Sequence, residues 1–151
     1  MKTLMSPANQ QEVFNRIARL SETDQRRWGQ MSVSQMLCHL TDGYLVGLGE
    51  KTASPATGFL QRTFIKWIAL QAPLGWTKGY PTRPEIKQGK GGTAPTEFSQ
   101  DRQQLISILH RFCSDLQEPC VSHPVFGLMT REDWWRWGYL HADHHLRQFG
   151  C

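Results

Sequence analysis

The sequence lacks any uninterrupted apolar run long enough to span a bilayer, and no apolar core of about 7 to 15 residues follows Met1. We therefore expect a cytoplasmic protein that makes no membrane contact. CxxC spacing is also absent among the four cysteines, and Cys38 and Cys113 fall inside apolar helical patterns. These features predict reduced structural thiols at Cys38, Cys113, Cys120 and Cys151.

Dense runs of basic residues are absent as well. The formal charge is +4 and the pI is near 9.0, but the Lys and Arg residues are scattered along the chain. A protein that follows a phosphate backbone usually concentrates its cations on one face or in one run. We therefore expect a small-molecule substrate and no nucleic-acid partner.

The size and composition fit a globular domain. The chain has 151 residues, of which 39% are hydrophobic and 20% charged, with six tryptophans. A chain of this length buries a hydrophobic core without disulfide or metal staples. We expect residues 1–151 to form a single domain.

Four long segments carry apolar residues at helical spacing, and none has the pattern of a strand. Ser32, with Gln35 three residues later, forms a capping-box signature, and Thr130 is a good cap with Asp133 at the same spacing. The expected helices cover residues 7–20, 32–48, 96–116 and 131–149, with a shorter helix beginning near Phe59 and ending before Pro73. This pattern predicts an all-α four-helix bundle with one short extra helix.

Residues 73–95, PLGWTKGYPTRPEIKQGKGGTAP, are rich in Gly and Pro and have no periodicity, which predicts a long loop. Ordered loops of this length often cover or line a site. Trp76, Tyr80 and Arg83 would suit a lid or a substrate clamp. The alternative is a mobile connector, and the sequence leaves both open.

Three of the six histidines lie within five residues of the stretch YLHADHHLRQ, residues 139–148. Such a cluster is a solvated surface, a hydrogen-bonded group in the core, or a metal site. On a helical wheel His141 and His145 fall in the apolar sector of the last helix, whereas His144 lies outside it. Residues four apart on a helix are neighbours, so two imidazoles at this spacing can converge on one ion.

A third ligand must come from another helix, and His39 lies at the edge of the apolar stripe of the second helix. Three neutral imidazoles would bind Zn²⁺ or Ni²⁺ and leave at least one position open to water or substrate, as in catalytic sites. The metalloprotease pattern HExxH is excluded, because Ala142 occupies the position of its glutamate. The candidate metal ligands are His39, His141 and His145.

The stretches MSVSQMLCHLTDGY, HPVFG and TREDWWRWGYLHADHHLRQFG resemble the DinB-like superfamily of bacterial metal-binding bundles, in particular an uncharacterised branch of it. The resemblance covers nearly the whole chain and implies an up-down-down-up four-helix bundle. In that superfamily one histidine of the second helix and two of the last hold the metal, which again implies His39, His141 and His145 here. Characterised relatives include thiol transferases, a thiol-dependent isomerase and metal-dependent hydrolases.

Two functions follow as hypotheses. The first is a metal-dependent enzyme with thiol S-transferase or hydrolase chemistry, in which a divalent ion activates water or a low-molecular-weight thiol. Its candidate proton-transfer groups are His144, Asp42 and Tyr44, although a supporting or solvated role is the plainer interpretation of each.

The second is a non-catalytic metal-binding or protein-interaction bundle. Its surface would come from the Trp-rich last helix, where Trp134 and Trp135 are expected in the core and Trp137 is the candidate to line a pocket. Apolar residues on the short helix would support a homodimer under either hypothesis.

Overall fold

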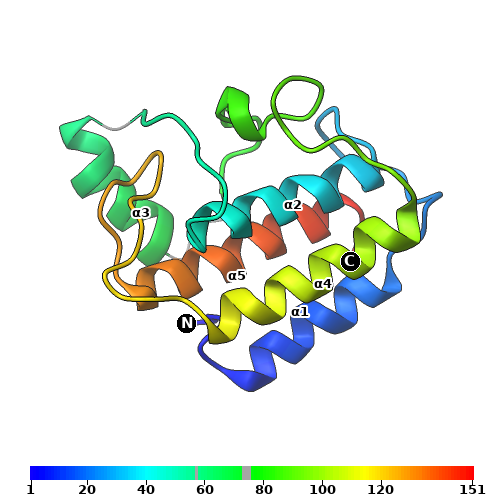
Figure 1. Ribbon diagram of the computed structural model, residues 1–151, viewed down its shortest axis with the longest axis horizontal. Coiled ribbons are helices and arrows are strands. Elements are labelled where there is room, and N and C mark those ends of the chain that lie inside the picture. Colours follow the sequence, from blue (N-terminus) through cyan, green and yellow to red (C-terminus); the bar gives the residue numbers. More distant parts are fainter. Residues whose placement is uncertain (57, 73–75) are drawn as a thin grey trace.

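The computed structural model describes residues 1–56, 58–72 and 76–151, and within these ranges the chain is all-helical, with no strand (Figure 1). The α-helices are α1 (Pro7–Arg19), α2 (Val33–Gly47), α3 (Lys66–Gln71), α4 (Phe98–Ser114) and α5 (Arg131–Gln148). A π-helical turn, η1 (Gln61–Ile65), precedes α3, and a 3-10 turn, η2 (Pro84–Ile86), lies between α3 and α4. The predicted all-α class is confirmed.

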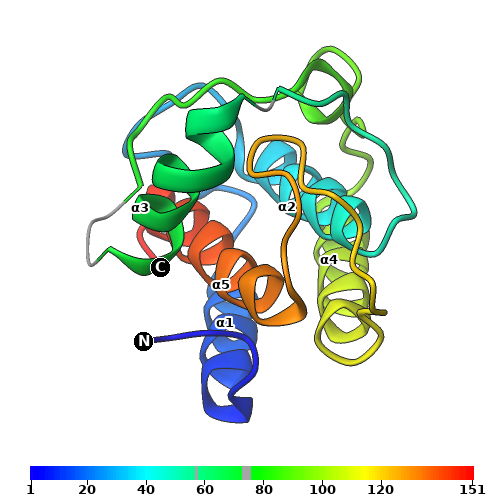
Figure 2. The same cartoon turned by 90° about the vertical axis from the view of Figure 1, so that its left-hand side faces the viewer.

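The four long helices close a ring of contacts. Helix α2 packs against α4 and α5, and α1 packs against the same two helices from the other side (Figure 2). The short α3 lies outside this ring and contacts α5. Apolar side chains from all four long helices fill the interior; those with no exposed area are Val13, Ile17, Met36, Leu37, Leu40, Tyr44, Leu105, Leu109, Phe112, Trp134, Ala142 and Leu146.

Side chains cap the two helices that carry the candidate histidines. The Ser32 hydroxyl accepts from the Gln35 amide while the Gln35 side chain accepts from the Ser32 amide. Thr130 and Asp133 form the same reciprocal pair at the start of α5. Because each capping box satisfies two amides that have no partner within the helix, the starting residue of each helix is fixed, and so is the phase of its histidines.

The helix predicted over residues 96–116 is shorter at both ends and spans Phe98–Ser114. Its start is moved by two carboxylates, since the Glu97 side chain accepts from the Ser99 amide and the Thr96 amide donates to Asp101. Asp115 no longer has helical backbone angles, although Leu116 is still buried in the core. The apolar periodicity therefore extends past the end of the helix that it predicts.

Residues 76–96, which we call the covering loop, lie across α2 (Figure 1). Residues 73–75 of the predicted loop lie outside the described part of the chain. Arg83 donates to the carbonyl and hydroxyl oxygens of Ser54, and Thr93 donates from both its amide and its hydroxyl to Asp42. These bonds tie the covering loop to the 48–56 segment and to α2, so Arg83 acts as an anchor for the loop.

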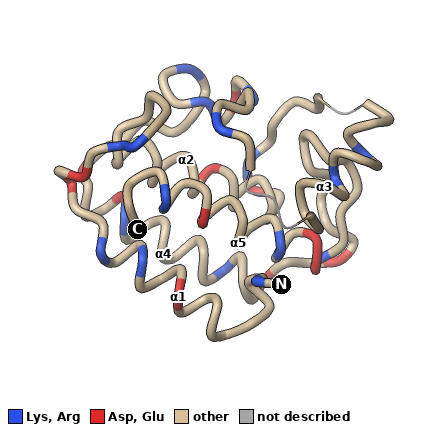
Figure 3. The backbone as a smooth tube through the Cα atoms, turned by 180° about the vertical axis from the view of Figure 1, so that it is seen from behind, with Lys and Arg blue, Asp and Glu red and all other residues tan. Residues whose placement is uncertain are grey.

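Basic residues are distributed over several elements (Figure 3). Among the described residues, no helix combines the length and apolar character needed to cross a bilayer. Four exposed apolar side chains of the described residues lie close together in the sequence, just before η1, within η1 and on α3: Phe59, Leu60, Phe64 and Trp67 are each at least 60% exposed.

Candidate metal centre

His39 of α2 and His141 and His145 of α5 meet in the interior, where one ring nitrogen from each lies within 4.8 Å of the others. The ring centroids form a nearly equilateral triangle with sides of 5.0, 4.8 and 4.9 Å. Each pair of rings is close to perpendicular, with angles between 76° and 83°. Three imidazoles arranged in this way can direct nitrogen lone pairs at one point between them.

The covering loop determines the tautomer of His39. Its Nδ1 lies 3.2 Å from the carbonyl oxygen of Ile86, and a carbonyl can only accept, so Nδ1 must carry the proton. In the neutral ring, Nε2 is then left with a free lone pair. Because Nε2 lies 3.1 Å from Nε2 of His141, its lone pair points into the cluster, where it can accept from His141 or coordinate a cation.

Two successive hydrogen bonds determine the tautomer of His145 in the same way. The Gln148 amide nitrogen donates to the carbonyl of Trp28 at 2.7 Å, which orients the side-chain oxygen of Gln148 toward His145. That oxygen lies 3.0 Å from Nδ1 of His145 and requires a proton there. Nε2 of His145 is therefore the unprotonated nitrogen of a neutral ring.

His141 is the ring with an unsatisfied atom. Its Nε2 lies 3.1 Å from Nε2 of His39, while its Nδ1 is buried and has no hydrogen-bond partner among the described residues. Trp137 packs on the ring with centroids 4.6 Å apart, and Gly43 lies against its edge. Trp137 is buried in this contact and does not line the cleft described below.

Burial lowers the pKa of all three histidines, since no more than 9% of any of these residues is exposed. For His141 and His145, repulsion between neighbouring rings lowers the pKa further. The rings are thus neutral at pH 7, which is the state that coordinates a metal. A cluster of neutral imidazoles with two preset lone pairs and one unpartnered nitrogen fits a divalent cation.

Two candidate proton-transfer residues are engaged elsewhere. The Tyr44 hydroxyl is fully buried and donates to the carbonyl of Gly138 at 3.0 Å, and burial raises the pKa of this phenol. The Asp42 carboxylate is also fully buried, and it accepts from Lys51 and Thr93. Both residues join structural elements, Tyr44 between α2 and α5 and Asp42 between α2 and the covering loop.

His144, the third candidate, is half-buried and borders a cleft of about 330 Å³. We call this the Trp28–Trp76 cleft, after the two indoles that line it with His144. The His144 ring lies 5.0 Å from the His145 ring, and Trp76 lies 6.1 Å from the His141 ring, centroid to centroid. Burial lowers the pKa of His144. The cleft therefore lies beside the histidine cluster, with His144 and Trp76 between them, and none of the three candidate ligands lines it.

Two further histidines lie outside the cluster. His123 is buried beside Trp134, and its Nδ1 accepts from the amides of Val125 and Phe126. His110 stacks on Phe14 at the surface of α4. Neither reaches the three converging nitrogens.

Sequence reasoning missed Gln148, Ile86 and Gly43 as supporting residues. Gln148 follows His145 by three positions on the same helix, a spacing at which side chains meet, so this partner was recognisable in principle. The carbonyl of Ile86 comes from a loop without periodicity and carries no comparable signal. Gly43 lies one turn after His39 on α2, but a helical glycine does not reveal what it contacts.

The comparisons with known proteins identify the family of the chain but assign no activity to it. A family model described as "Protein of unknown function (DUF1569)" matches residues 2–150. The chain therefore belongs to that family. No curated protein and no solved structure matches it.

Proposed function

We propose that this member of the DUF1569 family is a metal-dependent enzyme that binds Zn²⁺ or Ni²⁺ through His39, His141 and His145. Its reaction would be of the thiol S-transferase or hydrolase type, on a small molecule bound in the Trp28–Trp76 cleft. The proposal includes a cytoplasmic location and a single domain over residues 1–151.

One observation carries the proposal: two of the three buried imidazoles are held as the tautomer that exposes Nε2 to the centre of the cluster. The acceptors are the Ile86 carbonyl for His39 and the Gln148 amide oxygen for His145. Among these three rings, only His39 and His141 have nitrogens at hydrogen-bonding distance, with 3.1 Å between their Nε2 atoms. Here the third ring keeps an unpartnered Nδ1, which costs about 1–3 kcal/mol in a buried site. Outer hydrogen bonds that fix the tautomer are the usual companions of metal-bound histidines.

Three protein ligands favour catalysis over a purely structural role, because structural zinc sites are normally closed by four. A divalent ion at this position would lower the pKa of a water or thiol that it binds. The protein contributes a neutral ligand set, apolar packing around it from Trp137, and a cleft on the adjacent side.

His144 is the proposed proton-transfer residue of the three candidates. It lines the cleft and lies directly beside His145, whereas the hydrogen-bonding atoms of Asp42 and Tyr44 are occupied. Trp76 is placed to shield the cluster from solvent on the same side, since it packs toward both His141 and His144.

The resemblance to the DinB-like superfamily supports the same proposal. It implies an up-down-down-up bundle whose metal ligands come from the second and last long helices. The ring of contacts among α1, α2, α4 and α5 and the origin of the three histidines on α2 and α5 support this part of the proposal. Membership of the superfamily remains part of the proposal.

A second candidate is a non-catalytic metal-binding bundle that acts through protein contacts. The observation that favours it is the exposed apolar group of Phe59, Leu60, Phe64 and Trp67. An apolar surface of this kind often marks an association site, and a homodimer is one expected product. Light scattering on the purified protein, compared with a Phe64→Ser/Trp67→Ser variant, tests it.

The metal site is tested by elemental analysis of protein purified without added metal. We expect close to one equivalent of Zn or Ni, and loss of most of it in His141→Ala. His110→Ala is the matched control, because His110 lies at the surface away from the cluster. Full metal content in a folded His141→Ala variant would refute the site.

Activity is tested on the metal-loaded protein with a panel of low-molecular-weight thiols paired with electrophiles, and with ester and amide substrates. Turnover that falls in both His39→Ala and His144→Ala supports the enzyme. Absence of turnover across the panel, with metal bound and the fold intact, shifts the assignment to the second candidate.

A further inference from the structure

We infer that the Trp28–Trp76 cleft selects substrates that carry a carboxylate or phosphate group, bound by Arg27, Lys78 and Arg147, next to a planar apolar part that lies against the two indoles. This inference rests on the proposed function, because it identifies the substrate class of the same site. It concerns binding, so it can be tested without any knowledge of the reaction.

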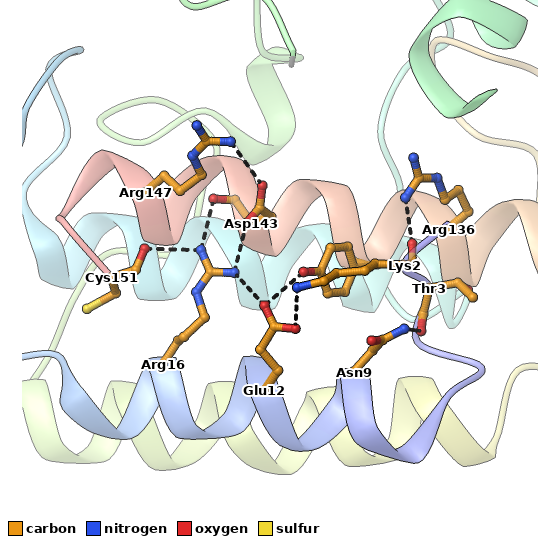
Figure 4. A network of polar contacts seen from close by, with 10 residues as sticks. Lys2, Thr3, Asn9, Glu12, Arg16, Arg136, Asp143, Arg147 and Cys151 are labelled. Carbon is orange, nitrogen blue, oxygen red and sulfur yellow. Dashed lines mark hydrogen bonds and ion pairs between the residues drawn. The ribbon is translucent and has the colours of Figure 1, made fainter. Parts of the chain in front are cut away.

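Charge is the first support. Three cationic side chains line the cleft, and Asp143 is the only acidic side chain among the described residues that line it. Asp143 is already engaged, since Arg16 donates to its Oδ1 at 2.8 Å and Arg147 lies 3.6 Å from its Oδ2 (Figure 4). Within the described ranges, no carboxylate lies within ion-pair distance of Arg27 or Lys78. The cleft therefore presents a surplus of positive charge.

The position of Asp143 strengthens this point. Arg16 of α1 also donates to the carbonyl oxygen of Cys151, so its guanidinium is held between Asp143 of α5 and Cys151 (Figure 4). Only 11% of the Arg16 side chain is exposed, compared with 65% for Arg147. Arg16 is thus the principal partner of Asp143, and the guanidinium of Arg147 remains accessible to a ligand.

The aromatic walls supply the second support. The indole nitrogen of Trp76 donates to the carbonyl of Ala69 at 2.8 Å, which fixes the ring. Lys78 lies over the face of Trp28, with Nζ 4.5 Å from the ring centroid. A cation held on an aromatic face is partly compensated and stays available to an anion, and the indoles offer flat apolar surface to an adjoining planar group.

The cleft also gives a bound molecule a direction. His144 and Trp76 form the wall nearest the cluster, whereas the cations Arg27, Lys78 and Arg147 are exposed to solvent. An anionic group at the cations would leave the rest of the molecule pointing toward the histidine wall. The anion would thus be recognised by side chains and need not bind the metal.

The test measures binding of benzoate, phenyl phosphate and uncharged benzyl alcohol to the metal-loaded protein, by calorimetry and tryptophan fluorescence. We expect both anions to bind more tightly than the alcohol, with a Kd that rises with salt. Arg27→Gln, Lys78→Gln and Arg147→Gln should each raise the Kd about three- to tenfold. Lys90→Gln, an exposed covering-loop lysine outside the cleft, is the matched control.

The two anions separate carboxylate from phosphate recognition. Equal affinity for benzyl alcohol, or a Kd that none of the three cleft variants changes, would overturn the inference. Repeating the titration on chelator-treated wild type and on His39→Ala separates it from the metal proposal. Binding that survives metal removal supports the cleft even if the metal proposal fails. Binding that disappears with the metal but not with Arg27→Gln or Arg147→Gln places the anions on the ion and refutes the inference.

Discussion

Gly43 and His141 are in direct contact across the interface of α2 and α5: a Cβ atom on Gly43 would lie 2.9 Å from Cε1 of His141 and 3.2 Å from its Nδ1. Real Cβ contacts under 3.0 Å are essentially never seen, so a larger residue at position 43 requires the His141 ring or the backbone to shift, and Trp137 lies only 3.1 Å from the same Cβ position. The glycine therefore defines the space into which one candidate ligand fits.

Gly43→Ala is expected to weaken metal binding by about tenfold or more, because the imidazole must rotate or the helices must separate. Overpacking of this kind also destabilises a fold by about 1–3 kcal/mol. The two effects are separated by competition with a chromophoric chelator and by denaturant unfolding of the metal-free protein.

Gly47→Ala is the matched control. It lies one turn further along α2, and its Cβ would approach Phe112 at 2.5 Å instead of a histidine. We expect a similar loss of stability with metal affinity close to that of the wild type. If both variants lose metal equally, general loosening of the bundle explains the effect and the specific role of Gly43 is refuted.

Gln148→Leu removes the acceptor that holds the proton on Nδ1 of His145. Metal affinity should fall about 10- to 100-fold, as it does when outer partners of metal-bound histidines are lost. In ¹⁵N NMR spectra of the metal-free protein, the His145 ring should change from a single Nδ1–H tautomer to a mixture. An unchanged tautomer would show that Gln148 does not control this ring.

Much of the site follows from helical periodicity. The wheel places His141 and His145 on one face, and the apolar stripe of α2 brings His39 toward them, so their convergence needed only the assumption that these helices pack. The caps at Ser32 and Thr130 could also be predicted, because a capping box depends on only four consecutive residues.

The parts of the site that were not predicted come from loops, whose apolar residues have no helical periodicity. Arg27 and Trp28 come from the link between α1 and α2, and Lys78 from the covering loop, so no local rule places them around one cleft. The engagement of Asp42 was missed for the same reason: its partner Thr93 is 51 positions away. The tertiary path of these loops is decided by anchors such as Arg83 with Ser54, which periodicity does not detect.

His123 makes the stability depend on pH. Burial lowers the pKa of His123 from 6.5 to about 3. Its Nδ1 lone pair also accepts hydrogen bonds from two backbone amides, so protonation of the ring in the folded state is disfavoured. The folded pKa lies below the unfolded one. The stabilisation is therefore complete above about pH 6.5 and is lost as the pH falls toward 3, up to a few kcal/mol.

The comparison is between wild type and His123→Asn, whose side-chain oxygen can accept the same amides without titrating near this range. Denaturant unfolding from pH 7.5 to 4 should show that the free energy of unfolding falls more steeply for the wild type. Parallel curves for the two proteins would mean that His123 does not contribute. Other buried histidines are present in both proteins, so their contribution cancels in the difference.

A substitution of Asp42 tests whether its carboxylate has a structural role, as an anchor of the covering loop, or a catalytic one. One of its oxygens accepts from Lys51 at 2.7 Å and from the Thr93 hydroxyl at 2.6 Å, and the other accepts from the Thr93 amide at 2.8 Å. In Asp42→Asn, an amide NH₂ must face one of these donors, and the Lys51 ammonium loses its charge partner. We expect a loss of about 1–3 kcal/mol in the free energy of unfolding. Hydrogen exchange should rise across residues 87–96, while the metal content should remain that of the wild type.

Thr93→Val removes only the hydroxyl and should show the same pattern at smaller amplitude. If Asp42→Asn instead keeps full stability and loses turnover on a substrate that the wild type converts, the carboxylate acts in the chemistry and the structural assignment is wrong.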